Sequence, residues 1–63
     1  MPTFTITVTT DIASDAPTIA VATTRTDLRT TRHALVALDA GATDYTADVA
    51  SVVRMHLAEL DKL

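Results

Sequence analysis

The clearest hydrophobic pattern in the chain lies in its last third, residues 43–63. Apolar side chains and one histidine recur there at alternating spacings of four and three residues, the repeat of a helix that buries one side. The stripe consists of Val49, Val53, His56, Leu60 and Leu63. We therefore expect a C-terminal helix whose stripe serves either as core or as a surface for self-association.

The first third of the chain alternates with a period of two. In residues 3–9, Phe4, Ile6 and Val8 share one face of an extended chain and threonines share the other, which is typical of a half-buried strand. No Lys or Pro lies inside this segment to prevent a second chain from adding to its edge. Residues 18–24 alternate through Ile19 and Val21 and favour a second strand, with a short helix as the alternative. With residues 10–17 as a loop, the two strands predict a β-hairpin.

The segment 25–40 is predicted to be a helix. Residues 24–27, Thr-Arg-Thr-Asp, have the spacing of a helix N-terminal cap, and Gly41 suits the left-handed conformation just past a helix end. A weaker apolar stripe comprises Leu28, Thr31, Leu35, Leu38 and Ala42. The short link to the last helix requires two antiparallel helices. We thus predict one small α+β domain, residues 1–63, of order ββαα, with an N-terminal β-hairpin packed on a C-terminal antiparallel helical hairpin.

The predicted core draws on all four elements. A chain of 63 residues hides only about 60% of the surface of its unfolded form, and without cysteine no disulfide can compensate. We therefore expect a homodimer or a higher homo-oligomer. Met55 is the expected exposed apolar side chain of the last helix. The expected core residues are Phe4, Ile6, Val8, Ile19, Val21, Leu28, Leu35, Leu38, Val49, Val52, Val53 and Leu60, with Leu57 at the margin.

The charge pattern contains one local basic feature. On the predicted helix 25–40, Arg25, Arg29 and Arg32 are four and three residues apart and form a ridge beside the apolar stripe. The ridge is a candidate site for an anion or for the carboxylates of a partner; the alternative is a solvated flank that pairs with Asp27 and with acids of a neighbouring subunit. The net charge of −3 disfavours nucleic acid as a partner.

Residues that could support catalysis or bind a metal do not form a recognisable motif. The two serines lie outside any Gly-x-Ser-x-Gly turn, a single glycine excludes a glycine-rich phosphate loop, and His33 and His56 lack the spacing of a metal pair. We expect no catalytic residue, no metal and no cofactor, and therefore not an enzyme. The longest apolar run, residues 34–38, is far shorter than the ~20 residues of a membrane span, and the chain start lacks the pattern of a signal peptide. We expect a cytoplasmic protein without a membrane partner.

The order of predicted elements in residues 18–60 suggests a family. A strand through Ile19 and Val21, a helix, a glycine-containing turn and the closing helix of residues 45–60 resemble the ribbon-helix-helix regulators. That resemblance implies a dimer in which two paired strands enter the DNA major groove and the second helices share a core. The groove-facing positions would be Thr18, Ala20 and Ala22.

Two functional hypotheses follow. The first is a small non-catalytic protein-interaction module, acting as a homo-oligomer, of the size of accessory proteins found in phage or mobile-element genomes. It would bind an unidentified protein partner through the helical pair or the strand edge. The second is a dimeric ribbon-helix-helix-like transcriptional regulator that binds DNA.

Overall fold

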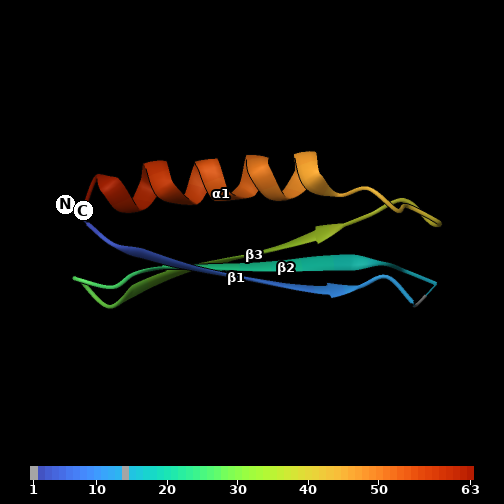
Figure 1. Cartoon of the computed structure of the whole chain (residues 1–63), viewed down its shortest axis with the longest axis horizontal. Helices are drawn as coiled ribbons and strands as arrows, with labels where there is room; N and C mark the ends of the chain where they lie inside the picture. The colour runs from blue at the N-terminus through green and yellow to red at the C-terminus, as the bar shows by residue number, and fades with distance from the viewer. Residues whose placement is uncertain (1, 14) are drawn as a thin grey trace.

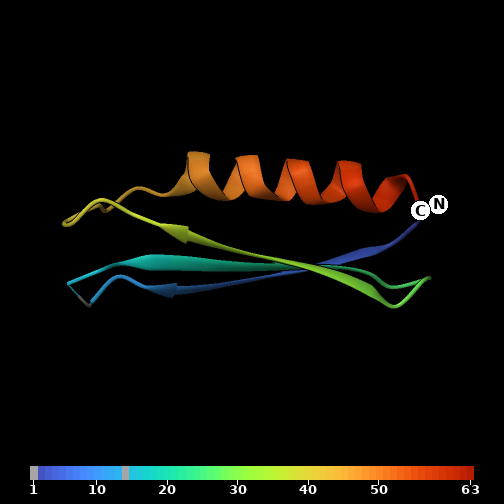
Figure 2. The ribbon, with the colours of Figure 1, turned by 180° about the vertical axis from the view of Figure 1, so that it is seen from behind.

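The fold is a three-stranded antiparallel sheet covered on one face by a C-terminal helix. The structure is a computed structural model and describes residues 2–13 and 15–63; Ser14, in the predicted loop, lies outside them. Strands β1 (Phe4–Asp11), β2 (Thr18–Arg25) and β3 (Thr30–Ala37) form a meander in the order β1-β2-β3, and helix α1 spans Thr46–Asp61. The helix runs along the sheet, and its C-terminal end lies at the same end of the molecule as the start of β1 (Figures 1 and 2).

The predicted α+β class is confirmed, but the predicted order ββαα is wrong. Residues 26–29 form a turn and Thr30–Ala37 form β3, so the elements follow the order βββα. β3 pairs with β2 along its whole length, from Thr18 opposite Ala37 to Arg25 opposite Thr30. The hairpin turn contains Arg29 with φ of 52°, whereas Gly41, with φ of 79°, lies in the loop after β3 and not at a helix end. Residues 18–24, left open between strand and helix, are a strand.

The helix prediction for residues 25–40 was wrong because the apolar residues of this segment fit both the period of a helix, 3.6 residues, and the period of a strand, two residues. On β3, Ala34 and Val36 lie opposite Val21 and Ile19 and share their side of the sheet, while Leu35 points the other way and is 72% exposed. Leu28, Leu35 and Leu38 therefore do not form the buried face of a helix. The long unpaired edge of β2 offers this segment a full ladder of backbone hydrogen bonds, and such tertiary pairing overrides a weak helical propensity.

The core lies between β2 and α1. Ile19 and Val21 from β2 and Val52 and Leu60 from α1 are its buried hydrophobic side chains. Each of these four was predicted to be buried. Four other predictions were wrong, because the side chains concerned are 40–72% exposed: Ile6, Val8, Leu28 and Leu35. Partly buried side chains surround the core, namely Ala34, Val36, Leu38, Tyr45, Val49 and Val53.

Polar contacts hold both ends of α1. At its start, the backbone N–H of Thr46 donates to Oδ1 of Asp44 at 3.0 Å, and this bond lowers the pKa of the Asp44 carboxyl. An acid at this end complements the positive end of the helix dipole. At its other end, Nη1 of Arg25 donates to the backbone O of Leu60 at 2.8 Å. A cation is thus placed at the carbonyl end of the helix, where it complements the negative end of the helix dipole.

Candidate protein-binding surface

The helix covers two of the three strands. The main contacts of α1 are with β2 and β3. On β1, Ile6 lies opposite Thr23 and Val8 lies opposite Val21, so both side chains point to the helix side of the sheet. Yet Ile6 is 42% exposed and Val8 is 40% exposed. The side of β1 that carries its apolar residues is therefore largely uncovered.

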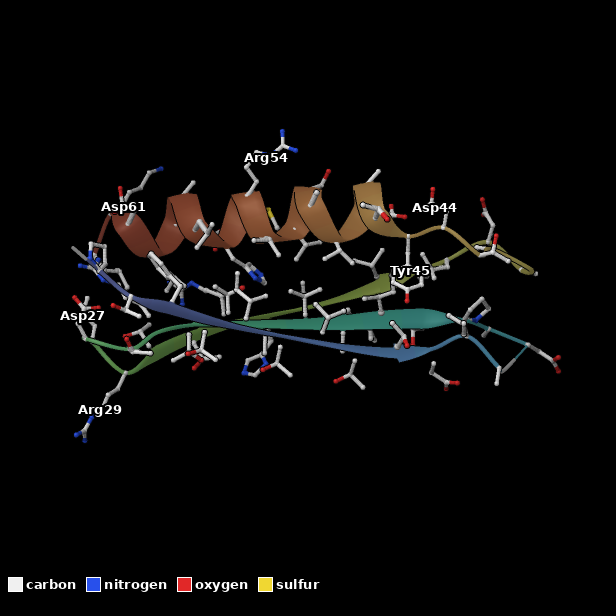
Figure 3. The ribbon with its side chains drawn as sticks, in the orientation of Figure 1. Asp27, Arg29, Asp44, Tyr45, Arg54 and Asp61 are labelled. Atoms are coloured by element: carbon white, nitrogen blue, oxygen red, sulfur yellow. The ribbon has the colours of Figure 1, made fainter. Side chains whose placement is uncertain are left out.

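An apolar groove runs between β1 and the first half of α1. It has a volume of about 630 Å³ and opens to solvent. Val8 and Thr10 contribute its strand wall; Tyr45, at the start of α1, points from the helix toward the sheet (Figure 3). The remaining lining side chains come from the first half of the helix: Thr46, Val49, Ala50 and Val53.

The groove adjoins an unpaired strand edge. In the described residues, β1 pairs with β2 and has no strand on its other side. The backbone N–H of Thr26 donates to the O of Thr3 at 2.8 Å, and these two residues continue the register of the β1–β2 ladder. Because alternate residues of a strand direct their backbone groups to opposite sides, Phe4, Ile6 and Val8 direct their N–H and C=O groups to the free edge. We call this edge, the side chains of Ile6 and Val8, and the groove the β1 surface.

The β1 surface lacks the features that usually protect an edge strand. Residues 3–9 contain no charged side chain and no proline, and β1 is eight residues long. Natural edge strands are generally short, bulged, charged or covered, because an exposed flat edge adds strands from other chains. The only charged residue of β1 is Asp11, at its end.

The opposite face of the sheet, which we call the open face, is also uncovered. Ala20 and Ala22 in the central strand are small, so taller neighbours on β1 and β3 leave a shallow hollow of about 400 Å³ above them. The neighbours are Thr7, Thr9, His33 and Leu35. Thr18, Ala20 and Ala22, the positions that the regulator resemblance directs to DNA, belong to this face. Over residues 18–60 the elements are two strands and one helix, which is not the order on which that resemblance was based.

The three arginines of the predicted ridge gather near the β2–β3 turn, but they do not form one ridge on a helix. Arg25, at the end of β2, donates to both carboxylate oxygens of Asp27, at 2.9 and 3.2 Å. This side-chain hydrogen bond is the largest cause that lowers the pKa of Asp27. Arg32, on β3, lies 3.5 Å from Glu59 on α1. Arg29 lies in the turn and points away from the molecule (Figure 3). Two of the three guanidinium groups thus pair with acids of their own chain.

The predicted helical stripe is divided between the core and the groove. Leu60 and His56 are buried, and Nδ1 of His56 lies 3.0 Å from Oγ1 of Thr23, with which it shares a hydrogen bond. Val49 and Val53 are half-buried and line the groove. Leu63 lies beyond the helix and is 58% exposed, and Met55 is exposed as predicted. The groove itself was not anticipated, although the uncharged alternation of residues 3–9 pointed to an exposed edge.

Within residues 2–13 and 15–63, no three His, Cys, Asp or Glu side chains come together in a way that could hold a metal ion. Over the same residues, no helix is both long and apolar enough to span a membrane. No family model, no curated protein and no solved structure matches this chain.

Proposed function

We propose that this protein is a small non-catalytic protein-interaction module that acts as a homo-oligomer, with the β1 surface as its contact region. The observation that carries the proposal is the coincidence of a free, uncharged strand edge with an apolar groove beside it. Backbone groups at such an edge supply hydrogen bonds to an added strand, and the adjoining groove receives apolar side chains. The concave regions are lined mainly by aliphatic and threonine side chains, which suits recognition more than reaction chemistry.

The size of the surface supports self-association. The chain has an accessible surface of 4416 Å², whereas a compact monomer of its 6.7 kDa mass is expected to expose about 3,900 Å². Its radius of gyration of 12.8 Å likewise exceeds the roughly 11 Å expected for its length. The excess, roughly 500 Å², is a large part of the ~800 Å² that each partner buries in a standard interface. Covering roughly 500 Å² in an interface would bring this chain to the exposure expected of a compact protein of its mass.

Light scattering coupled to size-exclusion chromatography tests the proposal. We expect a mass of at least twice 6.7 kDa at high protein concentration and dissociation on dilution. Val8→Lys should shift the protein toward the monomer, because it introduces a charge into the groove. The matched control is Leu35→Lys, which places the same charge on the open face at a side chain that is 72% exposed.

The outcomes separate the two faces of the sheet. Dissociation by Val8→Lys with an unchanged mass for Leu35→Lys would support the proposal. Dissociation by Leu35→Lys alone would move the contact region to the open face. A monomer at every concentration would contradict self-association. Salt-sensitive binding of the unmodified protein to random duplex DNA, measured by fluorescence anisotropy, would instead favour a regulator, since phosphate contacts weaken steeply with salt.

A further inference from the structure

We propose that the free edge of β1 pairs antiparallel with β1 of a second copy. The two copies are related by a two-fold axis that passes midway between Ile6 of one copy and Ile6 of the other. This inference rests on the proposed self-association and adds its partner strand, its register and its symmetry. The pairing joins two three-stranded sheets into one continuous sheet. Since a two-fold axis perpendicular to a sheet leaves its faces unchanged, both copies of α1 then lie on the same face.

The backbone groups at the edge are compatible with this register. Phe4, Ile6 and Val8 direct their N–H and C=O groups outward, as the bond between Thr26 and Thr3 establishes. With the axis at Ile6, this residue faces its own copy and Phe4 faces Val8 of the second copy. Each facing pair exchanges two hydrogen bonds, as in any antiparallel ladder. A register shifted by one residue would place outward-directed groups opposite inward-directed ones and would require the second apolar row to lie on the other face, which this two-fold axis does not allow.

The backbone groups allow more than one register, and the side chains distinguish between them. The pattern of residues 3–9, Thr-Phe-Thr-Ile-Thr-Val-Thr, reads the same in both directions about Ile6 if the three apolar residues are treated alike. Every apolar side chain of the strand therefore meets an apolar one, and every threonine meets a threonine. An axis at Thr7 would set Phe4 against Thr10, and an axis at Thr5 would set Val8 against Pro2. The axis at Ile6 is thus the register that matches all three apolar side chains.

Charge and geometry favour a second copy as the occupant. Each chain carries a net charge of −3, yet residues 3–9 are uncharged, so two copies can approach through this segment without placing like charges in contact. The pairing also brings the two grooves to face each other across a central row of Phe4, Ile6 and Val8 side chains. The apolar row of β1 in one copy then lies next to the same row of the other copy.

Disulfide cross-linking tests the register in a background without cysteine. In the proposed dimer, Thr5 faces Thr7 of the second copy in a pair that is not hydrogen-bonded, with Cα atoms about 4.5 Å apart, which suits a disulfide. Both threonines are exposed on the open face. A mixture of Thr5→Cys and Thr7→Cys should therefore oxidise to a covalent dimer on a non-reducing gel, whereas neither variant alone should do so. The control mixture, Thr5→Cys with Thr9→Cys, should remain monomeric on the gel.

Hydrogen exchange of the unmodified protein provides a measurement that needs no variant. The amides of Phe4, Ile6 and Val8 lie at the free edge in one copy and should become protected as protein concentration rises. Cross-linking of the Thr5/Thr7 mixture together with this protection would support the inference. Cross-linking of Thr7→Cys alone, or of the control mixture, would overturn the register. If light scattering shows a dimer but neither cross-linking nor concentration-dependent protection is seen, pairing through β1 is overturned while self-association stands. A monomer at all concentrations would refute the proposed function itself.

Discussion

Val8 on β1 and Val21 on β2 are the same residue type, lie directly opposite each other in the sheet and point to the same side. Val21 is 1% exposed and Val8 is 40% exposed. The difference arises because a helix with its side chains is about 10–12 Å wide and neighbouring strands are about 4.8 Å apart, so a single helix covers about two strands. Since α1 lies over β2 and β3, β1 is left without a cover.

Apolar alternation has two different consequences in this molecule. On β2 it builds the core, through Ile19 and Val21. On β1 it produces an exposed apolar row beside an unpaired edge, through Ile6 and Val8. The covered part of the molecule therefore determines whether the chain folds, and the uncovered part is available to bind another chain. The following experiments test this division.

The largest effect is expected from a charge in the covered part. Leu60 is fully buried, and Leu60→Asp replaces a packed side chain by an uncompensated carboxylate, which should cost about 4 kcal/mol or more and unfold so small a domain. Circular dichroism during thermal unfolding measures the loss. Leu63→Asp is the matched control at a side chain that is 58% exposed, and it should melt close to the unmodified protein. Equal melting curves for both variants would show that α1 does not cover the sheet through Leu60.

The two facing valines provide the most direct test. Val21→Ala should lower the free energy of unfolding by about 1.5–3 kcal/mol, because it removes buried methyl groups and leaves a cavity. Val8→Ala should cost less than about 1 kcal/mol in dilute protein, where its side chain is half in water. Urea unfolding at low protein concentration measures both values. Similar losses for the two variants would show that β1 is covered within a single copy.

An intermediate effect is expected from the buried polar pair in the core. Thr23→Val removes the hydroxyl that bonds His56 and leaves a buried ring nitrogen without this partner, at a cost of about 1–3 kcal/mol. In the double variant Thr23→Val/His56→Leu, both polar groups are absent, and part of that stability should return. A double-mutant cycle by urea unfolding measures the coupling. Additive losses would indicate that Thr23 and His56 act independently.

The smallest effect is expected at the exposed β2–β3 turn. The hydrogen bond from Arg25 lowers the pKa of Asp27 in the folded chain, so this contribution to stability is present above the ordinary carboxyl pKa of about 3.9 and is lost as pH falls through the folded value. Asp27→Asn should therefore slightly reduce the loss of stability in acid. Thermal melts across this pH range measure the change, with Asp15→Asn, an exposed acid in the preceding loop, as the control. An identical change in both variants would exclude a specific role for the Arg25 contact.

Local patterns predicted much of the fold correctly. The alternation of Phe4, Ile6 and Val8 predicted β1, and that of Ile19 and Val21 favoured β2. The spacing of Val49, Val53, His56 and Leu60 predicted α1 and its buried side. In the described residues β1 has no strand on its outer side, and the absence of Lys and Pro from residues 3–9 had predicted that its edge is unprotected. These predictions succeeded because each depends on the period of a few consecutive residues, which backbone geometry alone sets.

The errors concern relations between distant segments. Whether residues 30–37 form a helix or a strand depends on the free edge of β2, and no pattern within those residues reveals that edge. The placement of Arg25, Arg29 and Arg32 on one helix was wrong for the same reason: Arg25 and Arg32 lie on strands and contact the C-terminal part of α1. The groove beside β1 could not be predicted because it depends on where the helix lies.

Local sequence patterns thus predicted β1 and α1 and favoured β2, together with the face of each that is apolar, because side-chain direction follows from the local backbone period. The tertiary structure alone decided that residues 30–37 complete the sheet and that β1 remains uncovered. The physical reason is that a ladder of backbone hydrogen bonds forms between segments distant in sequence, and that one helix is wide enough to cover only about two strands.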